Sequence, residues 1–323
     1  MTPLARAADA LLEASVVGSF SRIGISARSR LLPEFSAGPE FAGGRVALIT
    51  GATSGLGLVT ASQLAWCGWT VHFLARDEAR AARAQGQIAA AGRSGARVSY
   101  GLADLEDTGS VLDFARAFLA SHGRLDVLIH GAGAIRERYA VNQAGIELTV
   151  AGQVVAPFAL TRKLLPALRA AAPARVITVS SGGMYTQRLD PARLQMPESA
   201  YRGVTAYARA KRAQVALSQE WARRISPADI AFHAMHPGWA DTPGIATALP
   251  RFRRVMRPIL RSPDEGADTI VWLATADRRL LGSGRFWHDR RPRPVSRLPW
   301  TRERDPGAAG RLWDCVAAAA AQD

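Results

Sequence analysis

Val46-Ala47-Leu48-Ile49-Thr50 runs directly into Gly51-Ala52-Thr53-Ser54-Gly55-Leu56-Gly57, so an apolar stretch ends in a glycine-rich turn that opens a helical pattern. Such a turn lets backbone amides and the positive end of the helix approach a pyrophosphate without interference from side chains. The spacing Gly-x-x-x-Gly-x-Gly differs from the commoner Gly-x-Gly-x-x-Gly fingerprint of dinucleotide-binding folds. The stretch therefore predicts a strand, a phosphate-binding turn and a helix, in that order.

Outward from this turn, short apolar runs alternate with helical patterns along the chain. The alternation indicates βαβ units, and right-handed crossovers then place helices on both faces of a parallel sheet. We therefore expect a single α/β domain with a doubly wound, Rossmann-type parallel sheet of seven strands. The predicted strands are Val46–Thr50, Thr70–Ala75, Arg97–Gly101, Asp126–His130, Arg175–Val179, Ile230–Met235 and Gly284–His288. The predicted helices cover residues 55–68, 77–92, 107–122, 142–172, 203–225 and 264–276.

Segments of a different character flank the predicted sheet. We expect a helical extension at residues 1–43, the Rossmann-type domain at 44–290, and a C-terminal tail at 291–323. Apolar side chains at helical spacing in residues 1–32 predict either a helix packed on the domain or at a dimer contact, or a helix in a membrane interface. The basic and apolar segment near 243–262 follows the sixth strand. It is either a mobile lid over a substrate or a helix lying on another element.

Composition narrows the classes of partner. The net charge is +14, but the arginines are spread along the chain without a basic stripe and interleaved aromatics, so we expect no specific nucleic-acid binding. Anionic membrane surfaces are the better candidate. Cys67 and Cys315 have no spacing typical of a metal site or a disulfide framework. Because the chain has no run of 18 apolar residues and no signal-peptide pattern, we expect a cytoplasmic protein, with peripheral membrane contact through residues 1–32 as the alternative.

Lysine is scarce in this chain, since only Lys163 and Lys211 among 41 basic residues are lysines. Lys211 follows Tyr207 by four positions, so that an ammonium and a phenol share one helix face. An ammonium is a compact charge that can lower the pKa of a phenol and still donate hydrogen bonds to a sugar, unlike a planar guanidinium. Taken alone, Tyr-x-x-x-Lys is also compatible with a surface pair on an amphipathic helix.

With the turn at 50–57 and Tyr207-x-x-x-Lys211 in this order, the chain resembles the short-chain dehydrogenase/reductase family, whose nucleotide loop reads Thr-Gly-x-x-x-Gly-x-Gly. The resemblance implies a nicotinamide cofactor. It assigns the pyrophosphate end of that cofactor to Gly51, Thr53, Ser54, Gly55, Leu56 and Gly57. The turn Asp241-Thr242-Pro243-Gly244 and the stretch 283–292 are also similar to the branch called dehydrogenase/reductase family member twelve.

The end of the second predicted strand, Leu74-Ala75-Arg76-Asp77, bears on which nicotinamide cofactor is bound. NAD-selective members of the family present an acid to the ribose hydroxyls here, whereas Arg76 suits a 2′-phosphate. We therefore favour NADP(H) over NAD(H), with a solvated Arg76 and a ribose-binding Asp77 as the alternative. Asp104 and Leu105 match the family's adenine-contacting position, although Asp104 is also compatible with a helix N-cap.

The fourth predicted strand leads into His130-Gly131-Ala132-Gly133, whose small residues match the family's position beside the cofactor. His130 stands where the family has Asn, and we interpret it as a structural histidine. Gln153 falls where the family places an Asn that holds a proton-relay water. The relay either persists there with a shifted water or is weakened.

The resemblance also assigns the reacting groups. Ser181 would bind the substrate oxygen, while Ser180 would face away because side chains alternate along a strand. Tyr207 would act as general acid or base, and Lys211 would lower the pKa of Tyr207 and hold the nicotinamide ribose. The family's turn at the nicotinamide carboxamide matches Pro237, Gly238 and Thr242.

These residues predict an NADP(H)-dependent oxidoreductase that moves hydride between the nicotinamide and a carbonyl or alcohol. Apolar residues between 252 and 260 indicate a hydrophobic small-molecule substrate. The alternative from another class is a cofactor-binding sensor or scaffold with little turnover, which Gln153 and His130 prompt. A homo-oligomer is a further expectation, because the family often forms dimers through helices that match 142–172 and 203–225.

Overall fold

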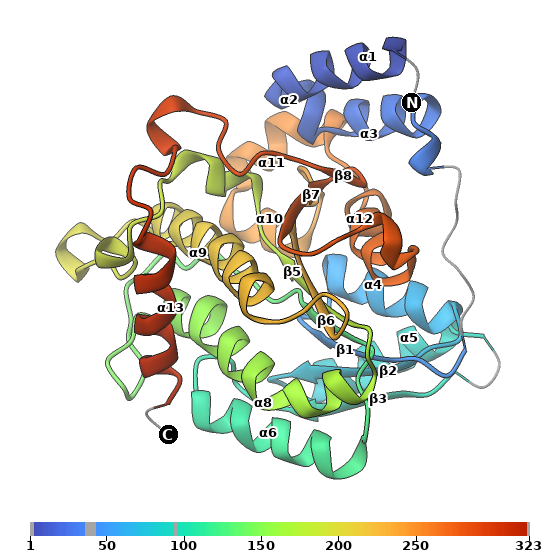
Figure 1. Cartoon of the computed structure of the whole chain (residues 1–323), viewed down its shortest axis with the longest axis vertical. Helices are drawn as coiled ribbons and strands as arrows, with labels where there is room; N and C mark the ends of the chain where they lie inside the picture. The colour runs from blue at the N-terminus through green and yellow to red at the C-terminus, as the bar shows by residue number, and fades with distance from the viewer. Residues whose placement is uncertain (1–2, 36–42, 94–95, 322–323) are drawn as a thin grey trace.

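A computed structural model describes residues 3–35, 43–93 and 96–321, and a twisted sheet forms the centre of this part of the chain (Figure 1). The sheet has eight strands in the order β3-β2-β1-β4-β5-β6-β7-β8 within the described residues. Strands β1 to β7 are parallel, and β8 pairs antiparallel with β7. The strand bounds are β1 Val46–Thr50, β2 Thr70–Ala75, β3 Val98–Leu102, β4 Val127–His130, β5 Ala174–Val179, β6 Ile230–Met235, β7 Arg285–His288 and β8 Arg291–Pro292.

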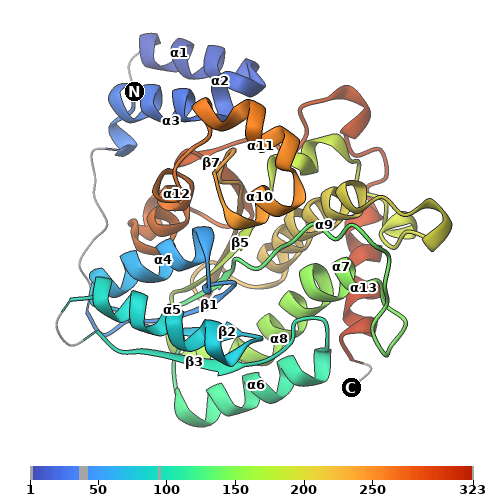
Figure 2. The same ribbon diagram turned by 180° about the vertical axis from the view of Figure 1, so that it is seen from behind.

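Helices cover both faces of the sheet, which confirms the doubly wound α/β fold expected from the sequence (Figures 1 and 2). The order of strands reverses between β1 and β4, which is where ligands bind in open α/β sheets. The helices are α1 Pro3–Ala14, α2 Val16–Phe20, α3 Arg22–Leu31, α4 Gly55–Trp66, α5 Glu78–Ala91, α6 Thr108–Ser121, α7 Leu148–Val150, α8 Ala156–Ala170, α9 Gly203–Arg224, α10 Pro243–Ala248, α11 Pro250–Met256, α12 Pro263–Thr275 and α13 Ala308–Ala319.

Two elements differ from the sequence-based expectation. The eighth strand, β8, was not expected, because two residues are too short to show a period in the sequence. The single helix expected at 142–172 is instead α7, a π-helical turn at Ala151–Val155, and α8. A π-helical turn carries the same apolar pattern as the helix around it, so periodicity does not reveal it.

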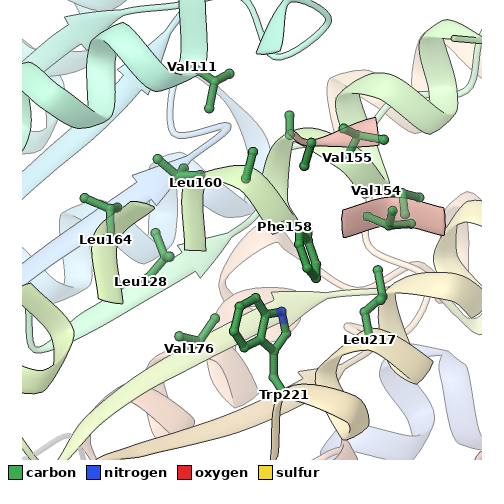
Figure 3. Close-up of a cluster of buried hydrophobic side chains, with 14 of the residues drawn as sticks. Val111, Leu128, Val154, Val155, Phe158, Leu160, Leu164, Val176, Leu217 and Trp221 are labelled. Atoms are coloured by element: carbon green, nitrogen blue, oxygen red, sulfur yellow. The ribbon is translucent and has the colours of Figure 1, made fainter. Parts of the chain in front are cut away.

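Two apolar layers hold the helices against the sheet. On one face, side chains of α4, α5 and α12 pack on β1, β2 and β4. On the other, α6, α8 and α9 pack on β4, β5 and β6, and Figure 3 shows Phe158, Leu160 and Trp221 meeting Leu128 and Val176 in this layer. Each buried side chain of this size stabilises the fold by about 1.5–3 kcal/mol relative to exposure.

The C-terminal segment, expected as a tail, contains α13, which lies against α8 and α9 (Figure 1). Trp313 of α13 meets Phe158 and Trp221 edge-on, with ring centroids 4.8 and 4.6 Å away. Arg162 donates a hydrogen bond to Ala320 O at 2.6 Å, which satisfies a carbonyl at the end of α13. Part of the surface expected to form a dimer contact is therefore covered by the chain's own α13.

The N-terminal helices α1 to α3 lie over β7, β8 and α11 at one end of the domain (Figures 1 and 2). Arg28 is fully buried there between Asp9, Glu13 and Asp289, so the first of the two expected arrangements, a helical segment packed on the domain, is what the structure contains. The outer side of α1 is solvent-facing, with Leu4 78% and Leu11 75% exposed. Among the described helices, none is both long and apolar enough to span a bilayer.

Candidate active site

One cavity of about 680 Å³ lies at the carboxyl ends of β1, β2, β4, β5 and β6. Every site residue expected from the sequence lines this cavity, although the residues come from segments up to 191 positions apart in the chain (Gly51 to Thr242). The expected residues found there are Gly51, Thr53, Ser54, Gly55, Leu56, Gly57, Arg76, Asp104, Leu105, Gly131, Ala132, Gly133, Gln153, Ser181, Tyr207, Lys211, Pro237, Gly238 and Thr242.

The glycine-rich turn is shaped for close backbone approach. Gly51 has φ +78°, and a Cβ atom there would lie 2.7 Å from the Cα of Ala132. A Cβ atom at Gly57 would lie 2.2 Å from the carbonyl oxygen of Gly51, well inside contact distance. The turn therefore requires glycine at both positions, and its residues line the cavity at the start of α4.

The far end of the cavity is lined by two arginines, Arg76 and Arg80. Arg76 is exposed, and its Nη1 lies 3.9 Å from Asp104 and 3.8 Å from Glu106. Asp77, which we considered as a ribose-binding acid, caps α5 by accepting a hydrogen bond from Arg80 N at 2.7 Å. Cap formation commits one oxygen of that carboxylate, and two guanidinium groups stand at this end of the site.

Asp104 is not a helix N-cap, so that alternative interpretation was wrong. The cap of α6 is Asp107, whose carboxylate accepts hydrogen bonds from Gly109 N and Ser110 N. Asp104 instead accepts from Glu106 N at 3.0 Å and lines the cavity. The two aspartates are three positions apart, and only the backbone conformation decides which one begins the helix.

Ser181 ends the segment after β5 and caps the following turn, since its hydroxyl accepts a hydrogen bond from Gly183 N at 3.2 Å. Ser180 points the other way and donates to the carbonyl oxygen of Lys211 at 2.9 Å. That bond ties the end of β5 to α9, the helix that carries Tyr207 and Lys211. Ser181 and Tyr207 consequently face the same cavity.

Tyr207 and Lys211 lie one turn apart on α9, with Lys211 Nζ 5.4 Å from the centroid of the Tyr207 ring. Burial raises the pKa of the Tyr207 phenol, and a hydrogen bond with Ser181 acts in the opposite direction. We expected Lys211 to lower this pKa, but the net direction is upward. Lys211 is itself buried, which lowers its own pKa to about 7, and its Nζ donates to Val179 O at 2.9 Å.

Gln153 lies in the π-helical turn, beside Lys211 and Gly133. Its Nε2 donates to Ala134 O at 2.7 Å, and its main-chain oxygen accepts from Gln214 Nε2 at 2.6 Å. None of the described residues donates a hydrogen bond to Gln153 Oε1. A Cβ atom at Gly133 would meet Lys211 Nζ at 2.9 Å and this Oε1 at 3.3 Å, so both polar atoms face Gly133.

His130 is a buried neutral histidine behind the cavity. Its Nε2 lies 2.8 Å from the hydroxyl of Thr161. Burial, with a smaller effect of the Lys211 charge, lowers the pKa of His130 to about 3. A histidine that stays neutral over the physiological range and bonds to a helix hydroxyl has the structural role that we expected.

Within the segment near 243–262, α10 and α11 differ in their relation to the cavity. Thr242 caps α10, and Pro243, Gly244 and Ile245 line the cavity. Arg253 of α11 forms two hydrogen bonds with Asp241, at 2.6 and 3.0 Å. These bonds hold α11 to the turn that follows β6.

Sequence reasoning missed several residues at the cavity. Arg80, Glu106 and Arg136 line the cavity near Arg76, and Glu106 pairs with Arg136. Arg80 could have been found, because it follows Arg76 by four positions at the start of a predicted helix. Arg136 lies in an irregular segment after β4, where no periodic signal exists.

Comparisons with known proteins agree with this geometry. A family model described as short chain dehydrogenase matches residues 45–250. The human protein named dehydrogenase/reductase SDR family member 12 is 41% identical over 251 residues, which cover 77% of this chain and 78% of that protein. Human retinol dehydrogenase 12 is 32% identical over 273 residues, which cover 84% of each chain. The solved RhlG/NADP active-site complex from Pseudomonas aeruginosa is 25% identical, with a TM-score of 0.62 over 77% of this chain and 96% of that one.

Proposed function

This chain belongs to the short-chain dehydrogenase/reductase family, in the branch similar to SDR family member 12, and from that premise we propose an NADP(H)-dependent reaction on a hydrophobic carbonyl or alcohol. As a member of this family it is an oxidoreductase that acts on CH–OH or C=O groups. The observation that carries the finer proposal is the convergence of Ser181, Tyr207 and Lys211 on one cavity with the glycine-rich turn. When bound, the nicotinamide would supply the hydride.

Each polar group at the reacting end would have a separate task. Ser181 would donate a hydrogen bond to the substrate oxygen and stabilise the charge that develops there. Tyr207 would give its phenolic proton to that oxygen in reduction, or take the proton in oxidation. Lys211, with a pKa near 7, can hold a proton on Nζ or release it at neutral pH, and its bond to Val179 O keeps Nζ in place.

The test of this proposal is the variant Tyr207→Phe. Removing the hydroxyl deletes the proton donor but leaves the ring, so we expect turnover to fall by about 10²–10⁴-fold or more while NADPH still binds. The measurements are reduced-nicotinamide absorbance with a panel of hydrophobic aldehydes and ketones, and NADPH fluorescence titration. Turnover equal to that of the unmodified protein would refute the assignment of Tyr207.

The preference for NADP(H) is supported by Arg76 and Arg80, because guanidinium groups form charge-assisted bonds to phosphate. The similarity to a protein solved as an NADP complex is consistent with it. We expect Arg76→Ala to weaken NADPH binding on the order of tenfold or more and NADH binding little. Arg93→Ala is the matched control, since Arg93 lies over Trp66 away from the cavity. Tighter binding of NADH than of NADPH by the unmodified protein would contradict the preference.

A hydrophobic substrate is supported by aromatic side chains near the turn after β6. Trp239 and Phe252 meet edge-on there with ring centroids 5.4 Å apart, and Ala240 and Ile245 of the same region line the cavity. The chain is also similar to a retinol dehydrogenase, whose name specifies an apolar alcohol. We expect kcat/KM to rise with substrate chain length in a homologous series of aldehydes, and a flat or falling series would oppose this.

A second candidate function, a cofactor-binding sensor or scaffold with little turnover, is favoured by one observation. The main-chain oxygen of Gln153 already accepts a hydrogen bond from Gln214 Nε2, which reduces the capacity of that oxygen to hold a relay water. Tight NADPH binding without hydride transfer across a broad carbonyl panel would support the scaffold. Measurable transfer that Tyr207→Phe abolishes would exclude it.

We also propose peripheral contact with anionic membranes through the exposed side of α1. Leu4 and Leu11 are mostly exposed, and Val255 of α11, 75% exposed, belongs to the same end of the molecule (Figures 1 and 2). Pelleting with phosphatidylserine vesicles should fall when Leu4 and Leu11 are both replaced by Ser. Leu280→Ser is the control because Leu280 is 64% exposed on a different segment. Equal pelleting of the double variant and the control would count against this surface.

A further inference from the structure

The break between α2 and α3 docks directly onto the active-site domain. The last carbonyl groups of a helix lack partners within the helix. Here Ser19 O accepts a hydrogen bond from Arg261 Nη2 at 2.8 Å, Phe20 O accepts from Trp239 N at 2.7 Å, and Ser21 O accepts from Arg261 Nε at 3.2 Å. Three consecutive carbonyls of the N-terminal segment thus accept hydrogen bonds from Trp239 and Arg261, which lie before α10 and after α11 in the chain.

The Phe20 side chain fills a site behind Ser181. Phe20 is 4% exposed, and its ring meets the rings of His236 and Trp239 edge-on, with centroids 4.4 and 5.8 Å away. A Cβ atom at Gly182 would lie 2.6 Å from the Phe20 ring, so the backbone next to Ser181 rests on this ring. Because Trp239 packs in turn on Phe252 of α11, one aromatic column runs from Phe20 to that helix.

Arg261 joins the N-terminal segment to the turn after β6 and to Asp289 through hydrogen bonds and an ion pair. It is 1% exposed, and its Nη1 donates to Pro237 O at 3.2 Å and to Asp289 at 2.6 Å. Arg28 of α3 binds the other oxygen of the same carboxylate at 2.5 Å. Burial alone would raise the pKa of Asp289, but the neighbouring charges, including Arg261 and Arg28, hold it well below its usual range.

The contacts leave no space at the turn that should face the nicotinamide. A Cβ atom at Gly238 would lie 2.5 Å from Arg261 Nε and 2.6 Å from Phe20 O. The conformation of Pro237 and Gly238 therefore depends on where Phe20 and Arg261 lie. Residues at one end of the chain consequently set the shape of a turn more than 200 positions later.

We infer that residues 15–28 are a positioning element of the active site. They act through Phe20 and Arg261 on three parts, which are the backbone next to Ser181, the Pro237-Gly238 turn and the ends of the segment 243–262. This inference rests on the proposed function for its catalytic readout. Phe20 and Arg261 do not line the cavity, so they are positioning residues. A segment that only stabilised the fold would not affect these three parts selectively.

The variant Phe20→Ala tests the inference, with Ile23→Ala as matched control, because Ile23 lies in the same segment, residues 15–28, but is 51% exposed. We expect Phe20→Ala to lower kcat/KM for a carbonyl substrate about tenfold or more, since small displacements of reacting groups are costly. NADPH binding through the glycine-rich turn should change less than the kinetic constant does. Phe20→Leu, which retains apolar volume, should recover part of the loss, and Ile23→Ala should behave like the unmodified protein.

Hydrogen–deuterium exchange separates this inference from the proposed function. In folded Phe20→Ala protein, we expect faster amide exchange in residues 180–186 and 237–262, with exchange in α5 and α6 unchanged. This readout needs no turnover, so it decides the inference even if the protein proves to be a scaffold. If Phe20→Ala does not fold, the same measurements are made on Phe20→Leu. Unchanged exchange in both stretches, together with unchanged kinetics in a folded variant, would overturn the inference.

Discussion

Acidification should destabilise this protein strongly, because several histidines are buried in neutral form. Burial is the main cause that lowers the pKa of His72 to about 4, and of His130 and His233 to about 3. The three lie far apart in the chain, at 9%, 3% and 0% exposure, and each has a hydrogen-bond partner for one ring nitrogen. We consider a change from pH 7.5 to pH 5.5.

The direction of the change in stability follows from whether the folded or the unfolded state binds more protons. In the unfolded chain a histidine has a pKa of about 6.5 and takes up a proton across this range, whereas the folded protein keeps it neutral. The unfolded state therefore binds more protons, and stability falls as pH falls. Each histidine should cost about 1.4 kcal/mol over these two pH units, so that the three together cost about 4 kcal/mol. Carboxylates with a lowered pKa stabilise the fold throughout this window. They lose that stabilisation only as pH falls toward and below their unfolded pKa of about 3.9.

The assay is urea unfolding followed by tryptophan fluorescence at both pH values, with the free energy of unfolding extrapolated to water. The variant His130→Asn removes one titrating group, and its loss between the two pH values should be smaller by about 1.4 kcal/mol. A free energy of unfolding that is the same at pH 7.5 and pH 5.5 would refute the reasoning. So would a pH dependence in His130→Asn equal to that of the unmodified protein.

Three further predictions concern the cavity. Lys211→Arg should reduce turnover by about 10²-fold or more despite the retained charge, because a planar guanidinium cannot replace the buried ammonium bonded to Val179 O. Steady-state kinetics measures this change, and full activity of the variant would contradict the prediction. Gly133→Ala should lower kcat about tenfold, because the added methyl group would lie 2.9 Å from Lys211 Nζ and displace the ammonium group. An unchanged kcat in a folded variant would show that the methyl group does not displace Lys211. Gly57→Ala should abolish NADPH binding in a fluorescence titration, because its Cβ would lie 2.2 Å from Gly51 O, and binding equal to that of the unmodified protein would show that the turn adapts.

The sequence predicted most of the fold because the βαβ repeat is local information. The strands from β1 to β7, except the edge strand β3, are runs of mostly buried residues, and most crossover helices show an apolar face, so both periods can be read without knowing the partners. The π-helical turn at Ala151–Val155 and the two-residue strand β8 were missed for a physical reason. The π-helical turn carries the apolar pattern of the helix around it and is held by a distant residue, Gln214, which donates a hydrogen bond to Gln153 O, whereas β8 is too short to show a period.

The residues of the candidate site were also accessible from the sequence, since the glycine-rich turn, Ser181 and Tyr207-x-x-x-Lys211 occur in a recognisable order. The pKa shifts of these residues could not be predicted from the sequence. The pKa of Tyr207 moves upward because the phenol is buried, and that of Lys211 falls to about 7 for the same reason. Burial is a property of the packed chain, so no spacing in the sequence could indicate it.

For this protein, the sequence alone determined the alternation of strands and helices and the glycine-rich turn, because each depends on residues within a few positions. Only the tertiary structure decided which aspartate caps α6, that α13 covers α8 and α9, that Phe20 reaches the segment after β6, and that Arg28 reaches Asp289 after β7. These facts depend on which buried charges and carbonyl groups find partners. A buried charge or carbonyl is paired by whatever donor the fold brings within hydrogen-bond distance, whatever its position in the chain.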